Sequence, residues 1–388
     1  MLWINFLHFY QPVNKEASVI REATEKSFLR VLRGIEEHKD IKFTLNINAC
    51  LFLRWEEMGY FDIFARLKKL LKAGKIELTG NAAYHPLLPL IPIEECKRQI
   101  LETESIFKKI LGNDFQRKGF FMSEMAYSEP VAILIKSLGY EWIVLDEIAY
   151  NGQLNQIDYN KNYFDKASGL QVVFRNRKIS NTYVPKTIIK LLEKKSTKTL
   201  ITASDGELYG LRHEDPTAEF EKVLKEQSLE TALLSSFLHV ERESEIIKII
   251  PSSWESTEQE IADKKPYLIW QDKDKEIQQR LWKLANFAYQ ICEEYKNDKN
   301  RNWSRWHLVR GLASCTFWWA SEKDFKHNFG PFAWSPDEIE RGMNELVRVV
   351  RSIDNIASRE QKIQAEKIYI DLKKIIWEKH WETYWKKK

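Results

Sequence analysis

Near the start of the chain stands the stretch Leu2-Trp3-Ile4-Asn5-Phe6-Leu7, which runs directly into His8-Phe9-Tyr10-Gln11-Pro12. The first six residues are mostly large and apolar, a composition typical of a buried β-strand. The residues that follow are polar or aromatic, and they end at a proline, which cannot donate to a strand ladder. We therefore predict a buried strand whose carboxyl end opens into polar side chains.

The same pattern recurs along the chain. Further β-rich runs occupy residues 42–48, 75–79, 119–123, 142–145, 171–174 and 199–204, with a weaker one at 246–250. Between them lie amphipathic stretches of helical periodicity, at residues 27–37, 60–72, 93–111, 130–138 and 217–228. This alternation predicts β/α units and a parallel sheet. Seven or eight such units predict an α/β fold with a closed or nearly closed barrel.

From about Asp272 the pattern changes to long helical repeats, at residues 276–297, 304–321, 336–353 and 359–378. We expect a catalytic β/α barrel over residues 1–270 and a C-terminal helical domain, packed on the barrel, over residues 271–388. The linking stretch 251–271 has no clear period and is expected to run over the barrel mouth.

Nearly every predicted strand ends in polar or ionisable side chains. After the first strand these are Asn46 and Asn48, Gly80-Asn81, Glu124, Asp146-Glu147, Arg175-Asn176 and Asp205-Gly206-Glu207. In a β/α barrel the carboxyl ends of all strands meet at one face, where the active site lies. Within residues 75–79, Ile76 and Leu78 would face the covering helices, which points Glu77 inward, where a carboxylate needs a partner. Such an interior suits a ligand with many hydroxyls.

Composition excludes several classes of partner. The net charge is only +4, from 60 basic and 56 acidic residues. The chain therefore has no strong positive electrostatic field of the kind that indicates a nucleic-acid partner. The cysteines lie far apart, without a C-x-x-C pair for a metal or a redox cycle: Cys50, Cys96, Cys292 and Cys315. The start of the chain has no targeting pattern, and no apolar run approaches the ~18 residues of a membrane span. We expect a cytoplasmic protein with no cofactor, no metal and no membrane partner.

Four motifs resemble, in order, the signature regions of glycoside hydrolase family 57, the family of α-amylases, 4-α-glucanotransferases and α-galactosidases. They are His8-Phe9-Tyr10-Gln11-Pro12, Gly74-Lys75-Ile76-Glu77-Leu78, Gly119-Phe120-Phe121-Met122-Ser123-Glu124 and Asp205-Gly206-Glu207-Leu208-Tyr209-Gly210. The resemblance spans roughly residues 1–330 and implies an incomplete (β/α)7 TIM-like barrel followed by helices. It also implies that Glu124 is the nucleophile and Asp205 the general acid/base of a retaining reaction.

The resemblance places His8 and Glu77 at substrate-binding and supporting positions. Further substrate-binding candidates are Gln11, Asn48, His85, Glu207 and Trp254, the last in the stretch 252–258 that best fits the family's fifth region. The sequence departs from the family at Tyr10, where a second histidine is usual, and at Phe121, where a tryptophan is usual. Both positions line the subsite nearest the scissile bond, so the sugar stays open between an α-glucan, which we favour, and an α-galactoside.

A retaining reaction on an oligosaccharide or polysaccharide requires two carboxylates. One attacks the anomeric carbon while the other, about 5–5.5 Å away, protonates the leaving oxygen and later serves as base. Hydrolysis and transglycosylation use the same residues and differ in the access of water to the glycosyl-enzyme.

Other interpretations stay open. Glu124 precedes a helix that starts with a proline and could be a simple helix cap, and Asp205-Gly206 could be only a turn. A metal-dependent carbohydrate deacetylase or α-mannosidase on a related barrel is a second possibility, although His8 is the sole histidine at a matching strand end and no H-x-x-x-H occurs. A catalytically silent sugar-binding barrel is a third.

Overall fold

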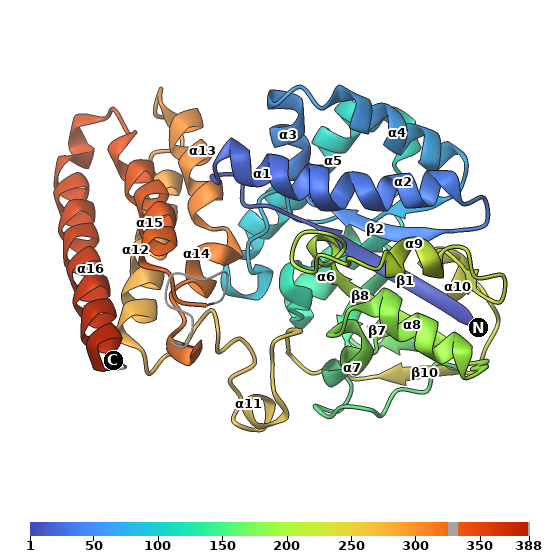
Figure 1. The fold of residues 1–388 in the computed structure, drawn as a ribbon. Helices are drawn as coiled ribbons and strands as arrows, with labels where there is room; N and C mark the ends of the chain where they lie inside the picture. The colour runs from blue at the N-terminus through green and yellow to red at the C-terminus, as the bar shows by residue number, and fades with distance from the viewer. Residues whose placement is uncertain (325–332, 387–388) are drawn as a thin grey trace. The chain divides into compact units, whose positions relative to one another are not determined.

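The computed structural model describes residues 1–324 and 333–386, which form two compact units. The first unit comprises Met1–Ala83 and Leu88–Ala262, and the second comprises Tyr84–Leu87 and Asp263–Lys388. Figure 1 shows the strands within the first unit, surrounded by its helices. None of the described helices combines the length and the apolar character needed to cross a bilayer.

The first unit contains seven parallel strands that lie in two sheets. These strands are β1 (Leu2–Phe9), β2 (Phe43–Ile47), β3 (Ile76–Leu78), β4 (Gly119–Phe120), β5 (Trp142–Asp146), β7 (Gln171–Arg175) and β8 (Thr199–Asp205). One sheet has the order β3-β2-β1-β8, and the other contains β7-β5-β4. The sheets are extended by β6 (Asn162–Asp165), β9 (Glu230–Thr231) and β10 (Ser244–Ile247), of which β6 runs antiparallel to β7.

Backbone hydrogen bonds link the two sheets along both margins. At one margin Gly80 N donates to Gly119 O and Phe121 N donates to Gly80 O, each at 2.9 Å. At the other, Asn176 N donates to Ile201 O at 2.8 Å. The seven parallel strands thus follow the ring order of a barrel without forming one continuous closed sheet. The predicted incomplete (β/α)7 barrel is confirmed.

The first unit has helices between its successive strands and one more, α11, after its last strand. They are α1 (Ala17–Ala23), α2 (Leu29–Glu37), α3 (Ala49–Glu57), α4 (Phe61–Lys72), α5 (Ile93–Leu111), α6 (Glu129–Ser137), α7 (Arg177–Ser180), α8 (Val184–Glu193), α9 (Glu219–Val223), α10 (Leu234–Leu238) and α11 (Glu258–Ala262). A π-helical turn, Thr24–Phe28, joins α1 to α2. The helix expected over residues 217–228 is shorter: it begins at Glu219, because Ala218 adopts a left-handed conformation (φ 51°), and it ends at Val223.

Short helix α10 packs into the apolar interior of the barrel. Its Leu234, Phe237 and Leu238 belong to one core cluster with residues that come from β1, β5, β7 and β8. Glu77 and Thr44 bind the start of this helix: Ser235 N donates to Glu77 Oε1 and Leu234 N to Thr44 Oγ1, each at 2.9 Å. Thr44 Oγ1 also donates to Glu77 Oε1 at 2.7 Å. These contacts give the inward-facing Glu77 the partners that its burial requires.

The second unit is helical, as predicted. Its helices are α12 (Glu276–Glu294), α13 (Arg301–Gly311), α14 (Ser314–Trp318), α15 (Pro336–Arg351) and α16 (Arg359–Lys386). The helix expected over residues 304–321 is broken in two, because Ala313 is extended (ψ 138°) and forms a bridge with Pro86.

Glu77 offers a test of how α10 is held. Replacing Glu77 by Ala removes the acceptor of Ser235 N–H and Thr44 O–H, so we expect the free energy of unfolding to fall by about 1–3 kcal/mol. Urea denaturation followed by circular dichroism measures the change. Glu141→Ala removes an exposed carboxylate and serves as the control. Equal effects of the two substitutions would contradict the proposed anchoring.

Candidate active site

His8 occupies the centre of the polar face at the carboxyl ends of the strands. In the parallel register it stands level with Asn46 of β2 on one side and Asp205 of β8 on the other. Its Nδ1 donates to Asn46 Oδ1 at 2.7 Å, and Asn46 Nδ2 donates in turn to Thr79 Oγ1 at 2.9 Å. Burial lowers the pKa of His8 below its usual value, against the opposing effect of Asp205. A neutral imidazole results, with Nε2 as its acceptor nitrogen.

Glu124 follows β4 in a short 3₁₀ helix, Ser123–Met125, with an unusual backbone. Both Glu124 (φ 62°) and Met125 (φ 50°) adopt left-handed conformations. Such conformations cost non-glycine residues on the order of 1–3 kcal/mol each and cluster at functional sites. Trp254 holds the strained residue twice, since its backbone N donates to Glu124 O at 3.1 Å and its indole Nε1 donates to Glu124 Oε2 at 2.8 Å. The carboxylate is thereby fixed in one orientation.

Asp205 is the last residue of β8, and its side chain is 28% exposed. The turn that follows requires a glycine, because a Cβ on Gly206 would lie 2.4 Å from the Phe9 ring. Arg212 binds Asp205 Oδ2 through NH1 at 3.0 Å and pairs with Glu207 Oε2 through NH2. Gln11 Nε2 donates to the other Glu207 oxygen. One guanidinium thus bridges two carboxylates at the strand ends.

Glu207 differs from Asp205 in its burial. Its side chain is 7% exposed, and this burial raises its pKa to about 7, while Arg212 acts in the opposite direction. The charge on Asp205 adds to the increase. Near neutral pH the Glu207 carboxyl therefore carries a proton for part of the time.

A cluster of three aromatic rings lies next to both predicted catalytic carboxylates. The His8 ring lies 4.7 Å from that of Phe121 and 6.1 Å from that of Trp254, and the Phe121 and Trp254 centroids are 6.0 Å apart. Trp254 binds Glu124, and His8 stands beside Asp205 in the strand register. The two acids consequently border the same cluster of rings.

Other predicted site residues have structural partners. Asn48 caps α3 by accepting from Cys50 N at 3.2 Å, and its Nδ2 donates to Ala82 O at 3.0 Å. Glu77 pairs with Thr44, two register positions before the level of His8 and Asn46. His85 belongs to the second unit, where its Nδ1 contacts Ser314 Oγ at 2.9 Å.

Sequence reasoning missed Arg212, which carries no motif and becomes apparent only from its two carboxylate partners. The sequence pattern identifies Arg175 and Asp146 as polar strand ends but predicts no contact between them. Their pairing, with Arg175 Nε donating to Asp146 Oδ2 at 2.6 Å, depends on the adjacency of β5 and β7.

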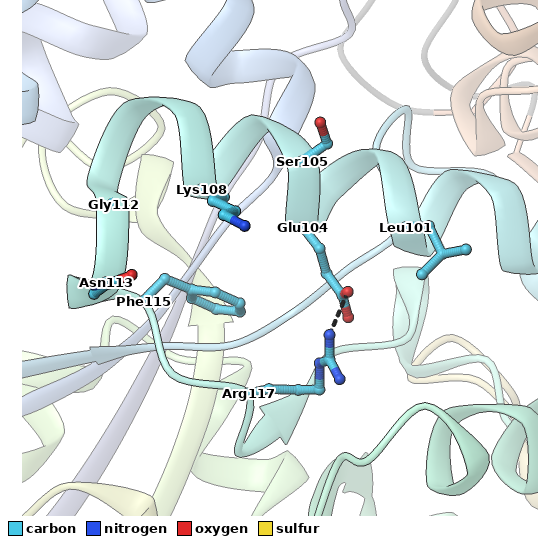
Figure 2. Close-up of a pocket in the computed structure, with 8 residues that line it drawn as sticks. All are labelled: Leu101, Glu104, Ser105, Lys108, Gly112, Asn113, Phe115 and Arg117. Carbon is cyan, nitrogen blue, oxygen red and sulfur yellow. Dashed lines mark hydrogen bonds and ion pairs between the residues drawn. The ribbon is translucent and has the colours of Figure 1, made fainter.

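A hollow in the first unit lies apart from the candidate site residues. A hollow of about 550 Å³ opens beside α5, lined by Leu101, Glu104, Ser105, Lys108, Gly112, Asn113, Phe115 and Arg117. Figure 2 shows Arg117 reaching Glu104 there, an ion pair of 2.6 Å. Arg117 precedes β4, so this hollow lies at the amino end of that strand, whereas Glu124 follows its carboxyl end.

Within residues 1–324 and 333–386, one group has the ligand types and spacing of a metal site: His213, Asp215 and Glu219. The Asp215 carboxylate already accepts hydrogen bonds from Arg30 NH2 (2.7 Å) and Tyr183 Oη (2.6 Å). It also accepts from the backbone N–H groups of Glu219 and Phe220. These bonds account for its buried charge, and the cluster is explained as a structural tie between α2, α8 and α9.

Known proteins resemble this chain in sequence and in fold. Residues 4–251 match the model of Glycosyl hydrolase family 57. An α-amylase of Pyrococcus abyssi is 29% identical over 147 residues, which cover 37% of this chain and 22% of that protein. A 4-α-glucanotransferase of Thermococcus litoralis is 26% identical over the same length and the same shares. The chain thus spans about a fifth of the length of the curated relatives it matches.

A solved structure shares the fold over nearly the whole chain. The family 57 branching enzyme of Thermococcus kodakaraensis superposes with a TM-score of 0.70 at 14% identity, covering 96% of this chain and 95% of that one.

The raised pKa of Glu207 predicts a pH-dependent stability. Between the unfolded pKa of about 4.5 and the folded value of about 7, the folded state binds more protons than the unfolded state, so the free energy of unfolding falls as pH rises. In Glu207→Gln this loss should be absent between pH 5 and about 7. Denaturation at several pH values measures the slopes, with Glu141→Gln as the exposed control. Parallel slopes in all three proteins would show that Glu207 does not titrate in this range.

Proposed function

Because the chain belongs to glycosyl hydrolase family 57, we propose that it is a retaining glycoside hydrolase or transglycosylase that acts on α-glycosidic bonds. Glu124 is the proposed nucleophile and Asp205 the proposed general acid/base. The observation that carries this proposal is the clamped Glu124 carboxylate, held by the Trp254 indole beside the same ring cluster that His8 shares with Asp205.

Glu124 has the environment that a nucleophile needs. Its attack on the anomeric carbon requires an ionised carboxylate held in a single orientation. The Trp254 indole N–H donates to Glu124 Oε2 and holds the carboxylate that would attack in a single orientation.

Asp205 must alternate between two protonation states. In the first step it protonates the leaving oxygen, and in the second it accepts a proton from the incoming water or sugar. Arg212 NH1 contacts Asp205 Oδ2 at 3.0 Å and orients this carboxylate. Because Arg212 is half exposed, its guanidinium has room to move aside when a sugar binds in the proposed reaction.

His8 is suited to a sugar hydroxyl rather than to proton transfer. Its Nδ1–H is committed to Asn46 and its lowered pKa keeps the ring neutral, so Nε2 would accept from a ring hydroxyl. The further substrate contacts that we propose are Gln11, Glu207 and Trp254. Gln11 is hydrogen-bonded to Glu207, which shares Arg212 with Asp205, and Trp254 is hydrogen-bonded to Glu124.

The substrate we propose is an α-glucan of the malto-oligosaccharide type. The names of the curated relatives, α-amylase and 4-α-glucanotransferase, support this class. An α-galactoside is the alternative to be tested in the same assays, because Tyr10 and Phe121 depart from the family pattern next to His8.

The first test replaces the nucleophile. Glu124→Gln should lower kcat by about 10⁴-fold or more, as expected when a covalent nucleophile is lost, while malto-oligosaccharide binding measured by calorimetry persists. Turnover of malto-oligosaccharides and of aryl α-glucosides and α-galactosides is compared, and proton NMR follows the anomer that is released first.

Retention of the anomeric configuration is expected. An inverted product, or no turnover of any α-glycoside by the unmodified protein, would refute the proposal. Loss of activity with a chelator would instead favour the metal-dependent deacetylase or α-mannosidase.

The second test separates the acid role of Asp205 from its base role. Asp205→Asn should lose about 10²–10⁴-fold in kcat on oligosaccharides, whose leaving groups need a proton. Aryl glycosides with acidic phenols need no such proton in the first step, so a burst of phenol should persist in stopped-flow traces. Equal losses of the first step on both substrate types would exclude Asp205 as the general acid.

A further inference from the structure

We propose that Asp146, acting through Arg175 and Arg177, is a positioning residue that holds the Trp254 turn and thereby orients the Glu124 carboxylate. The consequence for turnover rests on the function proposed above, whereas the positioning itself is a property of the fold. Asp146 ends β5, and its side chain is only 1% exposed.

The Asp146 carboxylate divides its two oxygens between the two arginines. Oδ2 accepts from Arg175 Nε at 2.6 Å, and Oδ1 accepts from Arg177 Nε at 2.8 Å. Oδ1 also accepts from Ile148 N at 3.0 Å. A buried carboxylate that accepts from both cations sets the planes of both guanidinium groups at once.

Arg177 holds the backbone of the turn that carries Trp254. Its NH1 donates to Ser256 O at 2.6 Å and its NH2 donates to Ser253 O at 3.5 Å. The turn is closed internally as well, because Ser253 N donates to Ser256 Oγ at 2.8 Å. Arg177 is therefore bonded to both residues that flank the Trp254-Glu255 pair.

Arg175 supports the Trp254 ring. Its guanidinium carbon lies 5.2 Å from the centre of that ring, a cation–π arrangement. NH1 of the same guanidinium donates to Ala203 O on β8 at 2.9 Å, so the cation is held between β5, β7 and β8. The ring that rests on it donates Nε1–H to Glu124 Oε2.

These contacts form one path from a buried carboxylate to the proposed nucleophile. The arginines come from the end of β7 and the residues just after it, and the turn they hold lies beyond β10. Without Asp146 two largely buried guanidinium groups would lose their shared anion, and the Trp254 turn would lose its fixed support. A small displacement of a reacting group costs up to about 100-fold in rate.

The activity-independent test is NMR of the indole N–H of Trp254 in the full chain, assigned by its disappearance in Trp254→Phe. We expect this resonance to shift in Glu124→Gln, Asp146→Asn and Arg177→Lys. Arg66→Lys is the matched control, because Arg66 makes a similar forked pair with Glu36 at 2.9 and 2.7 Å. A Trp254 resonance that stays in place in both Asp146→Asn and Arg177→Lys overturns the proposal, whether or not the protein turns over a glycoside.

The kinetic arm is a double-mutant cycle on an aryl glycoside. Arg177→Lys should lower kcat about 10- to 100-fold with little change in KM, and Arg66→Lys should leave kcat unchanged. If Arg177 acts through the indole bond to Glu124, adding Arg177→Lys to Trp254→Phe should cause no further loss of kcat. Additive losses would show that Arg177 acts elsewhere. Absence of activity in the unmodified protein refutes the proposed function alone, since the NMR result then decides the positioning.

Discussion

Strand β1 is hydrogen-bonded on both sides, and the register of these bonds determines which side chains stand at the polar face formed by the carboxyl ends of the strands. Residues Phe6–Phe9 pair with β2 and residues Leu2–His8 pair with β8, all in parallel. Parallel pairing brings the carboxyl ends together, so His8 stands level with Asn46 and Asp205. A slip of one residue would exchange inward and outward side chains, replacing His8 by Leu7.

The two ends of the barrel interior use different chemistry. Near the strand starts, Ile4, Phe6 and the apolar side of α10 fill the space, while Glu77 and Thr44 use their polar atoms to hold that helix. Near the strand ends, His8 and Asn46 bind one another. A polar interior is tolerated there because its donors and acceptors are matched.

Carboxylates at the strand ends are paired with arginine. Arg212 bridges Asp205 and Glu207, and Asp146 accepts from Arg175 and Arg177. Buried ion pairs contribute little net stability, since desolvation offsets their attraction, but breaking one is costly. Their value in this protein is geometric, because a forked guanidinium fixes the orientation of the groups it contacts.

Local pattern alone predicted the barrel strands, the helical region after them and the presence of carboxylates at or just beyond the strand ends. These features are encoded in short stretches, where apolar periodicity and a polar strand end are visible without knowledge of the partners. Helix α10 and strand β6 escaped prediction, because each is only four or five residues long and is stabilised by partners distant in the sequence, such as Glu77 for α10 and β10 for β6. The left-handed conformation of Glu124 likewise has no sequence signal.

The sequence by itself determined which residue types stand at the strand ends, and it determined the family from which the proposed chemistry follows. The tertiary structure alone decided which of them act together: that Trp254 binds Glu124, that Arg212 joins Asp205 to Glu207, and that Asp146 holds two arginines. These contacts join residues up to 130 positions apart. Their formation depends on strand order and register, which are properties of the whole sheet rather than of any one segment.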